Sequence, residues 1–353
     1  MKIKLAILDK DQNYLNRMVS TFGVRYADKL EIYSFTNAEA AISSLDSARI
    51  DVFLVDQSFD INPKLLPKRC GFAYFVDSVD IETINDRPAI CRFQKADLIY
   101  RQILSIYSEN AVNVSGIKLG DDSSKIIIFS SPCGGVGTST LAAACAQHYS
   151  EKGKKTLYLN LEKYGSSDLF FSGEGQFDMS DIIFALKSKK ANLSLKLESC
   201  VKQDSRGVYF YSQPKIALDM LELTTEDILR LVSEINLSGV YDYIILDIDF
   251  EIIADLRKLF LHSLAIVWIG DGSVISNCKI ARAYTALSTK EQAEDVPITN
   301  RILLIYNKFS NKSSKTVGLE ELKNIGGAPF YKGATEEQLL GVLSKMDMFD
   351  KIG

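Results

Sequence analysis

The first 108 residues alternate between short apolar runs and amphipathic stretches. The runs are bounded by turn residues, as expected of buried strands, and the stretches between them carry apolar residues at helical spacing. This alternation predicts a parallel sheet with helices on both faces. The predicted strands are "KLAILDKD", "LEIYSF", "DVFLVDQS", "GFAYFVD" and "AICRFQ", and the predicted helices are "NYLNRMVSTFG", "NAEAAISSL" and residues 96–108.

The pattern restarts after a polar, turn-rich stretch at residues 109–123, which we interpret as a linker. Residues 124–353 then repeat the strand and helix alternation. The apolar runs of this second part are "KIIIFSS", "KKTLYLNLE", "YDYIILDIDF" and "RILLIYNKFS". The predicted fold class is α/β, with a flavodoxin-like domain over residues 1–108 and a second three-layer domain with a mostly parallel sheet over residues 124–353.

Composition narrows the possible classes of protein. The 353 residues are 24% charged and 46% hydrophobic, with a net charge of −4 and a pI of about 5.5, which argues against a protein that mainly grips nucleic acid. Six cysteines without a C-x-x-C pair, and only two histidines, argue against a zinc site or a disulfide framework. The opening "MKIKLAILDKDQ" fits a strand rather than a signal peptide, and no apolar run approaches a bilayer span, so we expect a cytoplasmic protein.

Charged side chains follow several predicted strands of the first domain. Asp9 and Asp11 come after the first strand, Asp56 after the third and Lys95 after the fifth. In a parallel sheet the carboxyl ends of the strands meet at one edge, where α/β proteins place their chemistry. These four residues are therefore candidates for one site.

The second domain opens with "SSPCGGVGTST" at residues 130–140, between a predicted strand and a strong helix. Glycines in such a turn let backbone N–H groups face inward, and the N-terminus of a helix favours an anion. The lysines of a complete phosphate-binding loop are missing, because Cys133 and Thr138 stand at their positions. The alternative is a turn that only packs the helix on the sheet. The predicted nucleotide contacts from the loop are Gly134, Gly135, Val136, Gly137, Thr138, Ser139 and Thr140.

Other parts of the second domain supply candidates for the same nucleotide site. Asp247 ends the apolar run "YDYIILD", and with the Ser139 hydroxyl it is a candidate ligand for Mg²⁺. Asn307, at the end of "RILLIYN", is a candidate for contact with the adenine edge. Pro329 is assigned to the same cofactor site.

The first domain resembles the receiver domain of bacterial response regulators. Asp9, Asp56 and Lys95 match the metal-binding acid, the phosphoacceptor and the lysine of that family. Lys10 stands where the second acid of the family often lies, so Asp11 would have to compensate. The alternative is a docking domain whose acids are solvated strand ends.

The deviant loop "CGGVGTST" resembles that of ParA/MinD-type ATPases except at both lysines. A receiver-like domain before such an ATPase resembles the TadZ/CpaE proteins of tight-adherence (Flp, type IVb) pilus systems. This resemblance implies ATP and Mg²⁺ as cofactors, a homodimer, and pilus assembly proteins as partners. It also implies Glu162 as the acid that positions water, with Asn160 in place of the family's first acid. Because both lysines are missing, we expect slow or absent hydrolysis.

The resemblance further implies an assembly hub, placed at a cell pole or at the inner membrane through its partners and without membrane insertion of its own. A ParA-type partition ATPase that binds DNA, and a MinD-like positioning ATPase that lies on membrane, are the alternatives. The net negative charge argues against a partition ATPase that binds DNA. The apolar stripe of the tail "ATEEQLLGVLSKMDMFDKIG" fits a packed terminal helix better than a basic membrane-binding one. No helix-turn-helix or basic effector follows the first domain, which argues against a transcriptional regulator.

Overall fold

A computed structural model describes residues 2–62, 66–110, 124–165, 167–188, 192–251, 256–294 and 297–352. The described residues form two compact units. One holds the residues up to Asn110 together with those between Ser188 and Cys200, and the other holds the rest. Most of the predicted linker at 109–123 lies outside the described residues.

The N-terminal unit contains a six-stranded sheet in the order β2-β1-β3-β4-β6-β5. The neighbouring strands pair in parallel, except for the antiparallel hairpin of β5 and β6. Asn85 and Asp86, at the turn of this hairpin, both have positive φ, which suits a tight two-residue turn. The strands are β1 (Ile3–Leu8), β2 (Leu30–Phe35), β3 (Val52–Asp56), β4 (Gly71–Val76), β5 (Thr83–Ile84) and β6 (Arg87–Cys91).

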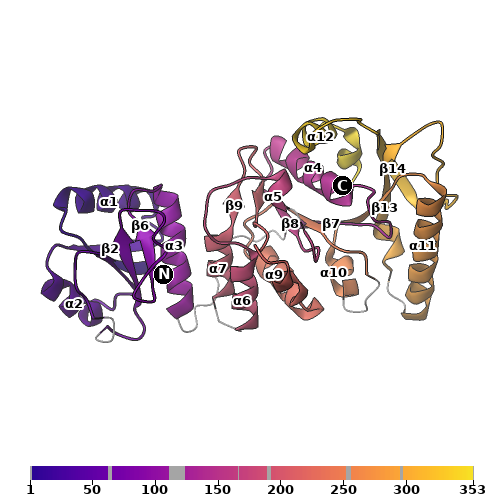
Figure 1. Cartoon of the computed structure of the whole chain (residues 1–353). Coiled ribbons are helices and arrows are strands. Elements are labelled where there is room, and N and C mark those ends of the chain that lie inside the picture. The colour runs from indigo at the N-terminus through magenta and orange to yellow at the C-terminus, as the bar shows by residue number, and fades with distance from the viewer. Residues whose placement is uncertain are drawn as a thin grey trace. The chain divides into compact units, whose positions relative to one another are not determined.

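Helices cover both faces of this sheet (Figure 1). α1 (Gln12–Arg25) and α3 (Ala96–Asn110) pack into one apolar cluster with one set of strand residues, and α2 (Ala38–Ser47) packs into another cluster with the alternate set. Because successive strand residues face opposite sides, one sequence can fill both clusters. The Asp11 carboxylate begins α1 by accepting hydrogen bonds from the N–H groups of Asn13 and Tyr14.

A helix from much later in the chain belongs to this N-terminal unit. α7 (Leu193–Cys200) packs against α3, and its Lys196 Nζ donates a 3.0 Å hydrogen bond to Ser105 Oγ. Glu198 of the same helix pairs with Lys29 at 2.5 Å. The sequence pattern places this segment in the second domain, yet in space it completes the first unit.

The C-terminal unit is built on an eight-stranded sheet in the order β14-β13-β12-β7-β11-β8-β10-β9. Its pairs are parallel except β9 with β10. The strands are β7 (Lys125–Ser130), β8 (Thr156–Asn160), β9 (Lys202–Gln203), β10 (Tyr209–Phe210), β11 (Tyr243–Asp247), β12 (Ala265–Gly270), β13 (Ile302–Phe309) and β14 (Lys323–Pro329). The first strand, β7, lies between β12 and β11, so the loop after β7 opens beside the ends of both neighbours.

Helices and the chain end complete this unit. The helices are α4 (Thr138–Glu151), α5 (Ser167–Phe170), α6 (Met179–Lys187), α8 (Leu218–Leu221), α9 (Thr225–Leu237), α10 (Leu256–His262), α11 (Val274–Glu294) and α12 (Glu336–Leu343), with 3₁₀ turns at Thr299–Arg301 and Asp347–Lys351. α12 lies beside α4 (Figure 1), and Tyr149 OH donates to the Phe349 carbonyl at 2.9 Å. The terminal segment thus packs into the unit. Among the described residues, no helix combines the length and the apolar character needed to span a bilayer.

Candidate functional site

An arginine occupies the acidic edge of the N-terminal sheet. Arg92 Nη1 lies 3.1 Å from Asp9 Oδ2 and 3.2 Å from Asp56 Oδ2, and its Nε lies 2.6 Å from Asp77 Oδ1. Asp9 and Asp56 are buried, so each needs a partner for its charge. Burial raises the pKa of Asp9, and the neighbouring Asp56 adds to this, while Arg92 opposes it. The arginine thus acts as the counter-ion of three carboxylates.

Arg92 is not evident from the sequence, because the apolar pattern of the fifth parallel strand continues to Gln94. The strand β6 ends at Cys91, which makes Arg92 the first residue beyond the carboxyl end. Lys95 lies in the turn before α3, where its carbonyl accepts from the N–H groups of Leu98 and Ile99. Asp11 serves as the helix cap, and its N–H donates to Asp9 Oδ1 at 2.8 Å.

The receiver-type magnesium and phosphoryl chemistry does not fit this arrangement. A guanidinium already fills the space between Asp9 and Asp56, where a cation would be held. Within the ranges that the structure describes, no three acidic, histidine or cysteine side chains are arranged to hold a metal ion. We therefore derive no phosphoryl transfer at Asp56.

The glycine-rich loop of the C-terminal unit joins β7 to α4. Gly135 and Gly137 have φ of +73° and +87°, in the left-handed region that favours glycine. A Cβ atom at Gly137 would lie 2.4 Å from Asn307 Nδ2, so no larger residue fits without displacing that side chain. Ser131 Oγ fixes the start of the loop by donating to the Ile269 carbonyl at 2.6 Å and accepting from Cys133 N at 3.0 Å.

The two positions without lysine are filled differently. Cys133 is buried, and its Sγ lies 3.5 Å from the carbonyl oxygen of Ser276. Thr138 is the first residue of α4 and is half-buried. Lys163, a nearby lysine in the sequence, pairs with Glu251 at 2.5 Å rather than with the loop. Neither position therefore brings a positive charge to the glycines.

Carboxylate and amide groups meet below the loop, at the ends of β8 and β11. Asn160 Nδ2 donates to Asp247 Oδ2 at 2.8 Å and to Glu162 Oε2 at 3.1 Å. Ser139 Oγ donates to the same Glu162 oxygen at 2.9 Å, and Tyr158 OH donates to Asp247 Oδ2 at 2.8 Å. An aspartate at position 160 would add a third carboxylate, whereas the asparagine amide bridges the two acids. The sequence had assigned Ser139 and Asp247 to Mg²⁺ and had matched Asn160 and Glu162 to the acids of the family, so Tyr158 is the one member of this network that it did not name.

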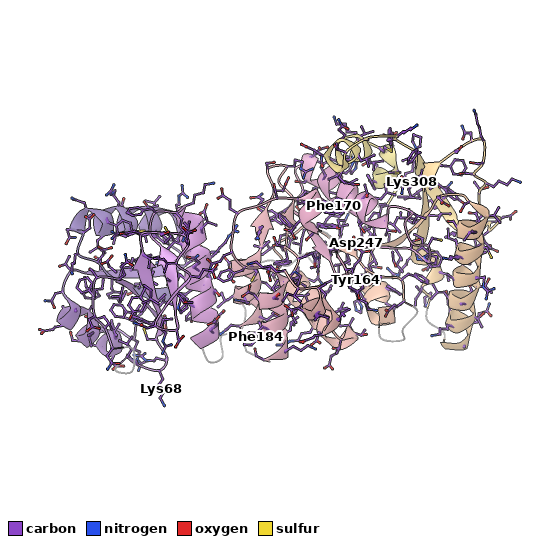
Figure 2. The ribbon with its side chains drawn as sticks, viewed as in Figure 1. Lys68, Tyr164, Phe170, Phe184, Asp247 and Lys308 are labelled. Atoms are coloured by element: carbon purple, nitrogen blue, oxygen red, sulfur yellow. The ribbon has the colours of Figure 1, made fainter. Side chains whose placement is uncertain are left out.

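Asp247, which is labelled in Figure 2, is fully buried, whereas Glu162 is half-buried. Burial raises its pKa to about 8, the charge of Glu162 adds to this, and the hydrogen bond from Tyr158 opposes it. Its Oδ1 atom is buried without a hydrogen-bond partner. A buried carboxylate oxygen with no donor can bind a cation or accept a hydrogen bond from the cation's water, so the residues present fit Mg²⁺ beside a phosphate loop.

Comparison with known proteins assigns the N-terminal unit. Residues 1–108 match the family model described as "TadZ-like, receiver domain". This segment is a TadZ-like receiver domain. No curated protein matches the sequence.

Solved structures resemble the C-terminal unit. A ParA family ATPase from Chlorobium tepidum is 20% identical, with a TM-score of 0.50, and the match covers 66% of this chain and 97% of that one. A chain of the MinC:MinD cell division protein complex from Aquifex aeolicus is 18% identical, with a TM-score of 0.49, over 65% and 93% of the two chains. At such identities the likeness to the ParA family ATPase shows the fold. A TadZ-like receiver domain is thus followed by a ParA-like α/β unit, as the sequence predicted.

The remaining predicted contacts of the ParA-like unit are Asn307, Pro329 and Thr140. Asn307 Nδ2 donates to the Val136 carbonyl at 2.9 Å, so its amide N–H is engaged by the loop itself. Pro329 ends β14 and pairs with Phe309 of β13. Thr140 Oγ1 lies 3.5 Å from Glu336 Oε2 of α12.

The raised pKa of Asp247 makes the pH dependence of stability testable. The folded chain keeps a proton that the unfolded chain releases, so this group's contribution to stability is full below pH 4 and is lost as the pH rises to about 8. Asp247→Asn removes that dependence. As the pH rises from 5 to 8, we expect the wild type to lose up to about 1.4 kcal/mol of its free energy of unfolding per pH unit relative to the variant. Denaturant titrations without nucleotide check this, and parallel pH curves for the two proteins would contradict it.

Proposed function

We propose that the ParA-like unit binds ATP with Mg²⁺ and hydrolyses it slowly or not at all, and that the bound state is a homodimer that serves as a positioning hub for a tight-adherence pilus system. The observation that carries the proposal is a loop that keeps its left-handed glycines, and brings Ser139 and Asp247 into one hydrogen-bond network, but has no lysine at positions 133 and 138. A TadZ-like receiver domain followed in the sequence by a ParA-like unit supports the positioning role.

The proposed binding of ATP rests on backbone N–H groups of the loop and on the N-terminus of α4. The loop from Gly134 to Gly137 offers N–H groups, and α4 directs the positive end of its dipole toward the same place. Ser139 and Asp247 would hold Mg²⁺, which neutralises phosphate oxygens when bound. Because Asp247 has a pKa of about 8, this binding would release its proton at neutral pH.

The proposed slow hydrolysis of ATP rests on the absence of lysine at positions 133 and 138. Stabilisation of the transferring phosphoryl group depends on preorganised cations, and each such donor is worth roughly 100-fold or more in rate. Here Glu162, the acid expected to position water, is hydrogen-bonded by Ser139 and Asn160. The site therefore suits holding a nucleotide better than consuming it.

Exposed apolar residues beside the loop support a second copy as partner. Val274 and Ile275, at the start of α11, are 81% and 71% exposed, and the next residue, Ser276, contacts Cys133 of the loop. Tyr164, after the Glu162 segment, is 77% exposed. Apolar side chains exposed this close to a nucleotide loop fit an interface that closes over the nucleotide.

An assembly experiment tests the dimer. With ATP and Mg²⁺ the wild type is expected to double its mass in light scattering, whereas Ile275→Asp stays monomeric because a buried carboxylate would lie unpaired in the interface. Leu237→Asp, which changes an exposed leucine at the end of α9, is the matched control and should still dimerise. A wild-type monomer under saturating ATP, or a dimeric Ile275→Asp, would contradict the dimer.

A further inference from the structure

The strand β13 is irregular where it faces the glycine-rich loop. Its pairing with β14 shifts register between Tyr306 and Phe309, and Lys308 has a φ of +55°. In a regular strand, consecutive side chains point to opposite faces, whereas a bulge can redirect one of them. A left-handed lysine is unfavourable, so it persists only where the surroundings hold it. Here Asn307 and Lys308 both contact the loop.

The two side chains bind consecutive carbonyl groups. Lys308 Nζ donates to Gly135 O and Asn307 Nδ2 donates to Val136 O, each at 2.9 Å. The described chain contains no cis peptide bond, and in a trans peptide unit the C=O and the following N–H point in opposite directions. Holding these carbonyls toward β13 therefore turns the N–H groups of Val136 and Gly137 away from it.

We propose that Lys308 is the cation with which this loop compensates for its missing lysines. It is a positioning residue: it holds Gly135 so that the N–H of Val136 faces the phosphates, and Asn307 does the same for Gly137. The proposal rests on the proposed ATP binding and names the residues that make it possible without a lysine in the loop.

A positive charge at this position does more than a neutral donor would. A charge-assisted hydrogen bond is stronger than a neutral one, and it polarises the peptide unit so that its N–H becomes a better donor. The ammonium group also brings one positive charge to a loop whose own lysine positions are neutral. Lys308, which is labelled in Figure 2, is exposed, so its replacement leaves the core intact.

The test compares nucleotide affinity in full-length variants. Lys308→Met is expected to weaken binding of ATP with Mg²⁺ about tenfold, and binding of adenosine less than twofold, because only the phosphates use the loop. Lys308→Arg should restore most of the loss. Lys312→Met, which removes an exposed lysine in the following turn, is the control of equal charge. Calorimetry gives the affinities, and melting temperatures check that the variants fold.

The outcomes separate this inference from the proposed function. If the wild type binds ATP and Lys308→Met binds it equally well, or if Lys312→Met loses as much, the role of Lys308 is wrong while ATP binding stands. Equal losses for ATP and adenosine would also overturn it, because they would assign Lys308 to the base. If the wild type binds no ATP, the proposed function and this inference both fail.

Discussion

Gly137→Ala is expected to lower the affinity for ATP by more than about 100-fold. Glycine is required there twice, by a φ of +87° and by the 2.4 Å that would separate a new Cβ from Asn307 Nδ2. The methyl group must displace Asn307, which releases the Val136 carbonyl and with it the orientation of the Gly137 N–H. Loss of the Gly137 donor costs about tenfold, and an alanine held at a φ of +87° adds strain of about 1–3 kcal/mol, so the two effects together give the expected factor.

Calorimetric titration of the purified variant with ATP and Mg²⁺ measures this loss. Gly341→Ala is the matched control, because Gly341 lies in α12 with open space around its Cβ position and takes no part in the loop. It should bind ATP as the wild type does. An affinity for Gly137→Ala within threefold of the wild type would show that the loop does not hold the phosphates.

Arg92→Met is expected to lower the free energy of unfolding by about 3 kcal/mol, as breaking a buried ion pair typically does. The variant leaves Asp9 and Asp56, both buried, beside each other without their counter-ion. The deficit depends on pH. Since the folded-state pKa of Asp9 already lies above its ordinary value and loss of the arginine raises it further, the deficit is greatest at neutral pH and shrinks toward pH 4.

Denaturant titrations at pH 7 and pH 4.5 measure the deficit. Arg69→Met is the control, because the Arg69–Asp46 pair is exposed and worth less than about 1 kcal/mol. Addition of Mg²⁺ without nucleotide should raise the melting temperature of Arg92→Met by more than that of the wild type, because the space that the arginine leaves can take a cation. A pH-independent deficit, or none, would contradict the role of Arg92 as counter-ion.

Strand periodicity predicted both sheets and the placement of the loop, because apolar runs and their bounding residues are local signals. It placed Asp9, Asp56 and Asp247 correctly at carboxyl ends. It missed Arg92 because "AICRFQ" continues the strand pattern past Cys91, and only the turn after Cys91 brings the arginine back over the acids.

Three other features had no local signal. Lys308 reaches the loop through a bulge and a left-handed backbone, and an N-K pair at a strand end indicates neither. α7 reads as part of the second domain because it lies within that stretch of sequence, whereas its Lys196 and Leu195 pack on the first. The network of Asn160 also depends on strands that are distant in the chain.

One measurement tests the central claim most directly: titration of the wild-type protein with ATP and Mg²⁺ in a calorimeter, with released phosphate assayed on the same sample. The account predicts saturable binding with an affinity in the micromolar range and turnover well below the roughly 1 s⁻¹ at the low end of ordinary enzymes. Absence of binding would contradict the site, and turnover of many molecules per second would contradict the claim that the loop has lost its catalytic cations.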